Sequence, residues 1–295
     1  MEHKVKYKMS LPLVSICIPT FNGEKFISEA MDSAISQTYR PLEIIVSDDD
    51  SKDKTLEIIT TYKNKTDIPI HIFHHKPEGI GANWNNCVSH SNGEYIKFLF
   101  QDDLLEVNCV EKMVDAIIAD KNIGLVFSKR KILYDKESKI HLKWIDINGD
   151  LQKNMEHILP IQDGKIFLKD PKLLNSPRNK IGEPVAVLLN KKVFEKVGYF
   201  STDLKQTLDY EYWYRIFKHY NVCFLNEQLV SFRLHNQQAT AFNILNSINE
   251  TKLIERILFR NYFKYLHPVS IFIIIKKHLL LNRWILYFKF KLKSA

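Results

Sequence analysis

Short apolar runs alternate with segments of helical periodicity through the first half of the chain, and this alternation restricts the fold more than any other feature. The run 13–18 precedes a segment whose apolar residues recur at helical spacing between Ile27 and Ile35. The pattern returns with strands at 43–47 and 70–73 and helices near 55–62 and 80–88. Because a strand, a helix and another strand in succession form one unit of a parallel sheet, the sequence predicts an α/β domain.

The second half of the chain is less regular. A fourth strand at 95–100 leads through Gln101-Asp102-Asp103 into a helix that begins near Val107. Residues 128–182 combine charge-rich stretches with scattered glycines and prolines, a composition typical of loops and short strands. Beyond them the sequence predicts a strand at 185–189, a helix at 191–197, a longer helix from about Asp209 and a strand near 230–234.

The net charge of +8 suggests a nucleic-acid partner until the charge is located. Residues 251–295 hold ten Lys or Arg against one acid, so the rest of the chain is close to neutral. A basic tail on a neutral body is more typical of a protein that docks on a surface than of one that reads a duplex. We therefore expect no nucleic-acid partner.

The cysteines and the apolar runs point to the cytoplasm. Four cysteines are scattered without the paired spacing of a zinc ribbon or a disulfide scaffold, which favours a reducing compartment. The first residues lack the apolar stretch of a signal peptide, and no run of about 18 uncharged apolar residues is present to span a bilayer. The prediction is a cytoplasmic protein.

Polar residues follow three of the predicted strands. Pro19-Thr20-Phe21-Asn22 follows the first strand, Asp48-Asp49-Asp50-Ser51 the second and Gln101-Asp102-Asp103 the fourth. Ligands of open parallel sheets bind at the carboxyl ends of the strands, where the connecting loops converge. The sequence therefore predicts a nucleotide pocket at this edge.

The order and spacing of these segments resemble glycosyltransferase family 2 over residues 12–240. The resemblance rests on Pro19-Thr-Phe-Asn after the first strand, on Asp48-Asp-x-Ser-x-Asp after the second, and on Gly93-Glu-Tyr-Ile-x-Phe-Leu before the acidic pair. It implies the GT-A fold, a Rossmann-like and mainly parallel sheet flanked by helices. It also implies inverting transfer from a nucleotide diphosphate sugar. Residues 1–127 would form the donor half, 128–240 the acceptor half and 241–295 a basic helical tail.

The resemblance also assigns residues to the donor. It implies that Asp48 and Asp49 accept hydrogen bonds from a uracil-type base and that Thr20 lines the same pocket. A UDP-linked sugar is therefore the expected donor. We also assign Pro19, Asn22 and Asn85 to donor binding. Ser51 and Asp53 are instead expected to cap the next helix, and Trp84, at a position often basic in the family, to pack in the core.

A divalent cation, Mn²⁺ or Mg²⁺, is expected beside the second acidic pair. Adjacent carboxylates repel unless a cation or solvent separates them. Asp102 is the expected ligand with Asp103 in support, although an acidic turn that only caps the next helix is the alternative. Phe100 stands where the family's motif has its first carboxylate, so diphosphate and water would complete the coordination. The resemblance places His235 near the metal, but a structural histidine is an equal alternative.

The resemblance places the general base at Asp209, at the start of a helix. The alternative is that Asp209 only caps that helix. A helix N-terminus favours the ionised carboxylate, so any rise in the pKa of Asp209 requires burial or a neighbouring acid such as Glu211. Glu183 is expected beside the acceptor, although the Gly and Pro on either side of it explain the segment equally well as a turn.

The basic tail allows two interpretations. Between 269 and 295, apolar residues alternate with Lys, Arg, Trp and Tyr, which suits the edge of an anionic bilayer on the inner face of the cell membrane. A lipid-linked sugar or another glycan would then be the acceptor, as in surface polysaccharide synthesis. The alternative is a helical tail that packs on the body or on a second subunit of an oligomer.

Two other functions compete with sugar transfer. A nucleotidyltransferase also uses strand-end carboxylates and a metal, but it usually has a Gly-rich loop with Lys or Arg after the first strand, and Pro19-Thr-Phe-Asn-Gly23 is not such a loop. A catalytically silent scaffold would keep the fold while the tail recruits it to a membrane. Replacement of Asp209 discriminates between an enzyme and a scaffold.

Overall fold

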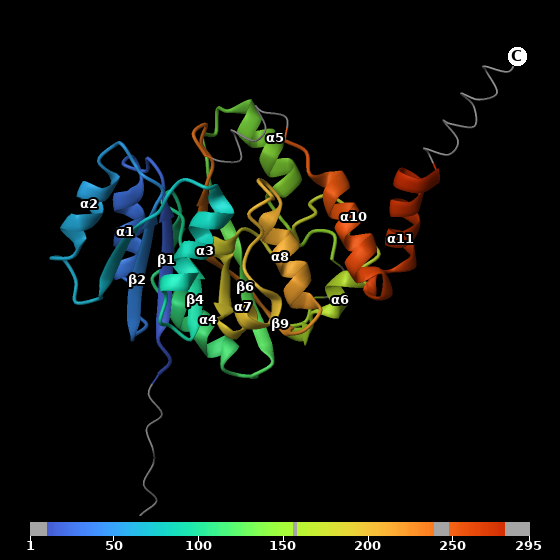
Figure 1. Ribbon diagram of the computed structural model, residues 1–295, viewed down its shortest axis with the longest axis horizontal. Helices are drawn as coiled ribbons and strands as arrows, with labels where there is room; N and C mark the ends of the chain where they lie inside the picture. The colour runs from blue at the N-terminus through green and yellow to red at the C-terminus, as the bar shows by residue number, and fades with distance from the viewer. Residues whose placement is uncertain (1–10, 156–157, 239–247, 281–295) are drawn as a thin grey trace, which may run out of the picture.

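A computed structural model describes residues 11–155, 158–238 and 248–280, in which nine strands form one central sheet flanked by helices (Figure 1). The strands are β1 (Val14–Thr20), β2 (Leu42–Asp48), β3 (Ile70–His74), β4 (Tyr95–Phe98), β5 (Leu104–Leu105), β6 (Ile123–Leu133), β7 (Ile161–Asp163), β8 (Val187–Asn190) and β9 (Asn221–Arg233). The α-helices are α1 (Ile27–Ile35), α2 (Thr55–Tyr62), α3 (Ile80–His90), α4 (Cys109–Ile117), α5 (Lys139–Asn148), α6 (Lys165–Leu168), α7 (Lys192–Val197), α8 (Leu208–Phe217), α10 (Thr251–Tyr262) and α11 (Pro268–Ile275). Short helical turns follow at η1 (Pro184–Ala186), η2 (Phe263–Tyr265) and η3 (Lys276–Leu280).

The sheet has a parallel half and a mixed half. Its order is β3-β2-β1-β4-β8-β6-β9-β5, with β7 paired to β9. The first four strands are parallel, whereas β8 runs antiparallel to both of its neighbours and β6 pairs in parallel with β9. The register pairs Thr20 with Asp48, so β1 and β2 end at the same level. This α/β sheet with flanking helices confirms the predicted fold class.

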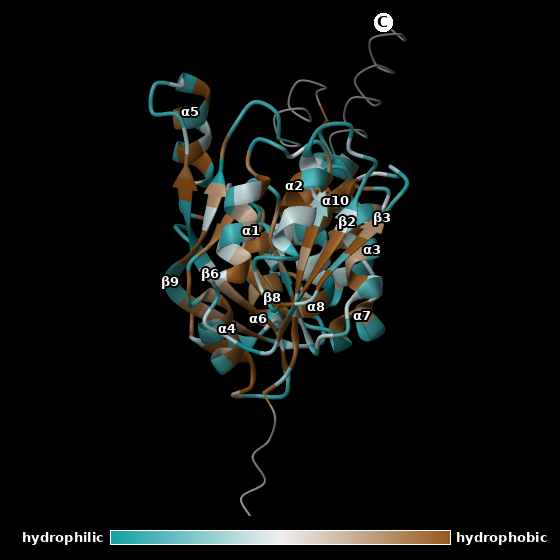
Figure 2. Ribbon diagram, turned by 90° about the vertical axis from the view of Figure 1, so that its left-hand side faces the viewer, coloured by the Kyte–Doolittle hydropathy of each residue, from teal (hydrophilic) through white to brown (hydrophobic). Residues whose placement is uncertain are grey.

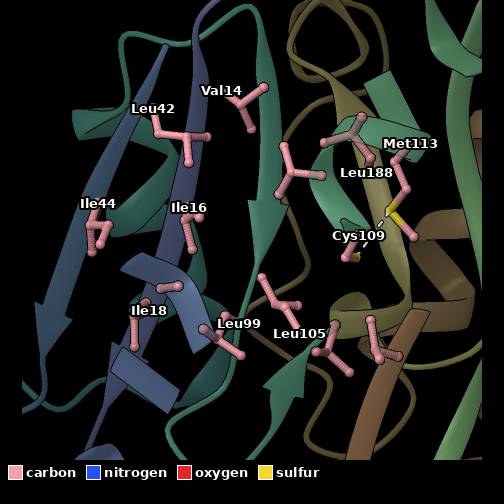
Figure 3. Packing of buried hydrophobic residues seen from close by; sticks show 14 of the residues in the cluster. Val14, Ile16, Ile18, Leu42, Ile44, Leu99, Leu105, Cys109, Met113 and Leu188 are labelled. Atoms are coloured by element: carbon pink, nitrogen blue, oxygen red, sulfur yellow. Dashed lines mark hydrogen bonds between the residues drawn. The ribbon is translucent and has the colours of Figure 1, made fainter. Parts of the chain in front are cut away.

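Alternation along the strands divides the core between the two faces of the sheet. Val14, Ile16 and Ile18 of β1 pack with α1, α2 and α4 on one face, where Figure 3 shows them beside Leu42 and Ile44 of β2. The intervening positions of β1 and β2 face α3, α7 and α8 on the other side. Burial on both faces explains why these strands are continuous apolar runs in the sequence.

The region 128–182 differs from the prediction of loops and short strands. β6 extends to Leu133, and α5 forms a ten-residue helix whose N-cap, Ser138, accepts a hydrogen bond from the backbone N–H of His141 at 3.3 Å. None of the side chains of α5 is buried. A helix without a buried apolar stripe leaves no clear periodicity in the sequence, which is why the pattern does not reveal it. Figure 2 shows α5 beyond the ends of β6 and β9.

The described part of the basic tail packs on the body. Ile254, Leu258 and Tyr262 of α10 are buried in the core that α8 also lines, and Figure 1 shows α10 beside α8 with α11 outside it. Residues 248–280 therefore agree with the alternative interpretation, a helical tail that packs on the body. The membrane interpretation concerns 269–295, of which 281–295 lie outside the described residues. In the described part of the chain, no helix is long and apolar enough to cross a membrane.

A buried carboxylate ties the tail to the body. The side chain of Glu255 is 1% exposed, and its oxygens contact Arg178 at 2.7 Å, Lys277 at 3.1 Å and His278 at 2.6 Å. Burial raises the pKa of Glu255, but the hydrogen bonds from these three residues outweigh burial and leave the pKa below its usual 4.5. The ionised carboxylate therefore joins α10 to the segment 178–182 and to η3.

The variant Glu255→Gln is expected to lower the free energy of unfolding by about 3 to 5 kcal/mol, because it removes one partner of a buried ion pair. Urea denaturation at pH 7 measures this loss. The pKa is depressed in the folded state, so the contribution is present above about pH 4.5 and disappears as the pH falls through the folded-state pKa. A difference between variant and wild type that stays constant from pH 7 to pH 3 would contradict this assignment.

Candidate active site

Side-chain hydrogen bonds join the ends of the first, second and fourth strands. The hydroxyl of Thr20 donates to Asp48 Oδ1 at 2.8 Å, which links β1 to β2. Gln101, just beyond β4, accepts from the N–H of Phe21 at 2.9 Å and donates to its carbonyl at 3.0 Å. Asn83 of α3 donates to the carbonyl of Thr20 at 3.3 Å. The polar segments predicted to converge therefore lie together at one edge of the sheet.

Asp48 and Asn22 shape the loop after β2. Asp48 is fully buried, and its two oxygens accept from Thr20 and from the hydroxyl and N–H of Ser51. Asn22, with φ at 48°, accepts from the N–H of Lys52 at 2.8 Å and donates its own N–H to Ser51 at 2.9 Å. Asp48 therefore holds the end of β1 and the loop after β2 together, and its predicted bond to a base stays a prediction. Pro19 lies within β1 and is buried.

Asp49, the second acid of this pair, contacts a histidine that follows β3. Its Oδ1 lies 2.6 Å from Nδ1 of His75, just after β3, and its side chain is 11% exposed. Burial raises the pKa of Asp49, with Asp48 adding to the rise, while the contact with His75 opposes it. Sequence reasoning missed His75, although its place after the third parallel strand was the available signal.

Ser51 and Asp53 were both predicted to cap the next helix, but Lys54 occupies the N-cap of α2 and only Asp53 contacts the first turn of that helix. Ser51 bonds Asp48 and Asn22, as described above. Asp53 accepts from the N–H of Thr55 at 3.0 Å, inside the first turn of α2, and from the N–H of Glu24 at 3.0 Å. The helix-capping prediction for Asp53 therefore describes one of its two roles, and the other is to tie α2 to the loop after β1.

Asn85 has a structural role that differs from its predicted donor contact. Its amide donates to the carbonyl of Phe200 and accepts from the N–H of Phe200, both at 2.9 Å. Both polar atoms of the side chain are therefore engaged with backbone 115 residues away. Trp84, 9% exposed, packs against Phe98, Phe100 and Phe200, in agreement with the core role expected for it.

The variant Asn85→Ala is expected to lower the free energy of unfolding by about 1 to 3 kcal/mol, because two backbone groups lose their partners. Affinity for UDP should remain within twofold of wild type. Urea denaturation and calorimetric titration measure the two quantities. If the variant is as stable as wild type but binds UDP more weakly, Asn85 contacts the donor as the sequence predicted.

Asp102 and His235 meet across 133 residues of sequence. Nε2 of His235 lies 2.8 Å from Oδ2 of Asp102, and both side chains are 17% exposed. Arg233, at the end of β9, donates from Nε to the carbonyl of Asp102 at 2.9 Å. β5 pairs with β9 next to this contact, which fixes the turn after β4 against the residues that follow β9. The site thus presents a carboxylate and an imidazole side by side.

Asp103 does not share the exposed position of Asp102. It is 1% exposed, its Oδ1 accepts from the N–H of Arg233 at 2.9 Å, and its buried Oδ2 has no hydrogen-bond partner among the described residues. Burial and the neighbouring Asp102 raise the pKa of Asp103 well above its usual range. Asp103 is therefore buried, and its predicted support of Asp102 as the metal ligand stays a prediction.

Asp102 and His235 are the donors available to a cation at this edge. Within residues 11–155, 158–238 and 248–280, no group of three or more His, Cys, Asp or Glu side chains is arranged to hold a metal. A carboxylate and an imidazole in contact are suitable ligands for Mn²⁺ or Mg²⁺ when substrate oxygens and water supply the other positions. The residues present therefore fit a cation that arrives with a diphosphate.

Asp209 lies buried in the first turn of α8. Its Oδ2 accepts from the amide of Asn179 at 2.7 Å, and its Oδ1 accepts from the N–H of Tyr210 at 2.7 Å. The N-cap of α8 is Thr207, so Asp209 does not occupy the capping position that was its alternative role. Burial, followed by the charge of Glu183, raises the pKa of Asp209 to about 7. The neighbouring acid is Glu183 and not Glu211, which pairs with Arg215 at 3.0 Å.

Glu183 influences acids at two places, the turn after β4 and the start of α8. Its charge raises the pKa of both Asp103 and Asp209, so it is close to each of them. Its Oε2 lies 3.2 Å from Nε of Arg130, whose side chain is 4% exposed. The charge of Glu183 therefore acts on Asp103, next to Asp102, and on Asp209 at the start of α8. A carboxylate with a pKa of about 7 can accept a proton at neutral pH.

Comparison with known proteins points to one family. A family model described as glycosyl transferase family 2 matches residues 15–198. An uncharacterized glycosyltransferase of Rickettsia typhi is 30% identical over 241 residues, which cover 81% of this chain and 69% of the relative.

Solved structures share the fold at lower identity. S. aureus TarS 1–349 in complex with UDP-GlcNAc is 19% identical, with a TM-score of 0.59 over 84% of this chain and 66% of that chain. The mannosyltransferase PcManGT from Pyrobaculum calidifontis, in complex with GDP-Man and Mn²⁺, is 17% identical, with a TM-score of 0.57 over 81% of this chain and 62% of that chain.

Proposed function

Because the chain belongs to glycosyl transferase family 2, we propose that it transfers a sugar from a UDP-linked donor to an acceptor hydroxyl with inversion of configuration. The observation that carries the proposal is the buried Asp209, whose pKa of about 7 suits a general base at neutral pH. Asp102 and His235, which are in contact, form the proposed binding position of the leaving diphosphate and its cation.

Residues 1–127 form the proposed donor half. Asp49, positioned by His75, accepts a hydrogen bond from an N–H of the uracil base. Thr20, Asn22 and Asp48 hold the loops that surround the base, and Pro19 lies buried in β1 directly before Thr20. The complex of TarS with UDP-GlcNAc supports a uracil nucleotide, since that protein shares the fold.

Asp102 and His235 are the proposed holders of Mn²⁺ or Mg²⁺. When bound, the cation neutralises charge on the diphosphate. Asp102 offers a carboxylate oxygen and His235 an imidazole nitrogen, and Arg233 fixes the backbone of Asp102. The presence of Mn²⁺ in the PcManGT complex supports this assignment.

Asp209 removes the proton of the acceptor hydroxyl in the proposed reaction. The acceptor oxygen attacks the anomeric carbon from the face opposite the diphosphate, the new carbon–oxygen bond forms, and the bond to the diphosphate breaks. The electron pair of the broken bond leaves with UDP, and the proton remains on Asp209. Asn179 orients the carboxylate through its bond to Oδ2. Because attack and departure occur on opposite faces, the configuration inverts.

The acceptor half is residues 128–240, and the acceptor is a glycan or a lipid-linked sugar. The lipid-linked alternative agrees with a tail, 269–295, that docks on the inner face of the cell membrane. In α11, Val269 is 44% exposed and Phe272 is 60% exposed, and Lys276 follows directly. Apolar side chains beside cations suit an anionic surface. Association of two copies through the same tail is the other arrangement.

A panel of nucleotide sugars tests the proposed function. UDP-, GDP- and dTDP-linked sugars are added with and without Mn²⁺, and thermal unfolding and release of the nucleotide are measured. A UDP-linked sugar at 100 times its Kd should stabilise the fold by about 2.7 kcal/mol. It should also be hydrolysed slowly, so that UDP is released without an added acceptor. A scaffold would bind without release. A response to none of the sugars contradicts the proposal.

A further inference from the structure

A cavity of about 190 Å³ lies in the acceptor half, apart from the strand-end residues. It is lined by Ser128, Lys129, Arg130, Gly149, Asp150, Leu151, Gln152 and Gln228. These residues come from the middle of β6, the loop after α5 and the facing part of β9. None of them has a role in the donor site described above.

An irregularity in the sheet produces the cavity. Ser128 pairs with Leu225, but Lys129 pairs with Gln228, so that Asn226 and Glu227 of β9 have no counterpart in β6. Such a bulge bends the strand and re-aims its side chains. The loop after α5 closes the other side, where Gln152 donates to the carbonyl of Lys180 at 2.8 Å. Bonds from both sides therefore hold the walls of the cavity.

The lining of the cavity is suited to a polyhydroxylated ligand. It offers a hydroxyl, two carboxamides, a carboxylate and two cations, which together donate and accept hydrogen bonds as sugar hydroxyls require. Asp150 disfavours a purely anionic ligand, and the guanidinium of Arg130 is already paired with Glu183. The volume is below the roughly 300 Å³ at which pockets for drug-sized ligands begin, so a whole nucleotide sugar does not fit. A ligand of the size of one sugar ring fits this volume.

The cavity is connected to Asp209 through two side chains. Arg130 lines the cavity and contacts Glu183 at 3.2 Å, and Glu183 acts electrostatically on Asp209. Trp144 and Asn148 of α5 support Arg130 from the other side, by a ring contact at 5.6 Å and by a hydrogen bond at 2.9 Å. Arg130 and Glu183 therefore link the wall of the cavity electrostatically to Asp209.

We propose that this cavity binds a sugar ring of the acceptor that is not the ring receiving the donor sugar. The acceptor is then a glycan of at least two rings. This inference rests on the proposed function, since it assigns a role in the same reaction. Binding energy from such a remote ring positions the reacting hydroxyl at Asp209.

The test uses the double variant Asp150→Asn with Gln228→Ala. Both residues are exposed, and asparagine at 150 can keep the bond that Asp150 Oδ1 accepts from the N–H of Gln152. The control is Asn226→Ala, an exposed residue of the same bulge outside the lining. Methyl glycosides of glucose, galactose, mannose and N-acetylglucosamine are titrated one at a time, and saturation-transfer NMR measures their binding.

At least one glycoside should bind to the wild type and to Asn226→Ala, and its Kd should rise about tenfold or more in the double variant. UDP affinity, measured on the same samples, should be equal in all three proteins. An unchanged glycoside Kd in the double variant, or no glycoside binding to a wild type that does bind UDP, overturns the inference and leaves the proposed function intact. Failure of the wild type to bind any nucleotide sugar contradicts the proposed function, while the glycoside titration still decides the cavity.

Discussion

Replacing Asp209 with Asn is expected to slow sugar transfer by about 10²- to 10⁴-fold, the usual contribution of a general base, while UDP binding persists. The amide has the shape of the carboxyl group, and its single oxygen can keep the bond from the N–H of Tyr210, while the bond from the amide of Asn179 is lost. The proton acceptor is lost. Initial rates with a saturating donor and calorimetric titration of UDP separate the two effects.

The pH dependence of the wild type supplies a second readout for Asp209. The ionised carboxylate is the active form, so kcat/KM should fall as the pH drops through about 7 and reach a plateau above it. The sign for stability is the opposite. The folded state retains a proton between about pH 4 and pH 7 that the unfolded chain has lost, so the contribution of this group to stability decreases over that range. Asp209→Asn should therefore be at least as stable as wild type at pH 8.

The matched control for this variant is Asp203→Asn, an exposed acid that precedes α8. Its rate and pH profile should equal those of the wild type. Full activity of Asp209→Asn, or a pH profile that the substitution leaves unaltered, would remove the base from the mechanism.

The second large effect is expected at the contact of Asp102 with His235. Asp102→Ala should reduce transfer by about 10²- to 10³-fold, the range for removal of one group that stabilises developing charge. It should also abolish any increase in UDP affinity caused by Mn²⁺. His235→Ala should act in the same direction, because it removes the other donor at this position.

Titrations of UDP with Mn²⁺ and with EDTA measure this effect directly. Asp163→Asn, an exposed acid in β7, serves as the control and should retain both the activity and the response to Mn²⁺. If Asp102→Ala still binds UDP more tightly with Mn²⁺ than without it, the proposed cation site is wrong.

The parallel half of the fold could be predicted because its information is local. β1 and β2 are buried on both faces and each precedes a helix with its own periodicity, and α2 begins at Thr55 and ends at Tyr62 as the pattern indicated. β6 and β9 could not be delimited in this way. They pair across about a hundred residues, with two register shifts near Lys129, and the middle of β9 is exposed. Their bounds depend on the partner strand and not on their own sequence.

In the candidate active site, too, local sequence predicted some features, and contacts between distant residues determine the others. Position after a strand was enough to bring Asp48, Asp49 and Asp102 to one edge. It could not reveal that Asp48 binds Thr20 and Ser51 or that Asn85 binds the backbone of Phe200, because those roles depend on contacts that only the folded chain creates. The partners of the reactive groups, His75 and Asn179, were missed for the same reason.

A crystal structure with UDP and Mn²⁺ tests most directly whether the separated acids serve one ligand. The base should contact Asp49, the cation should bind Asp102 and His235 together with the diphosphate, and Asp209 should face the far side of the sugar position. A nucleotide bound away from this edge of the sheet, or one whose diphosphate is remote from both Asp102 and Asp209, would contradict the proposed mechanism.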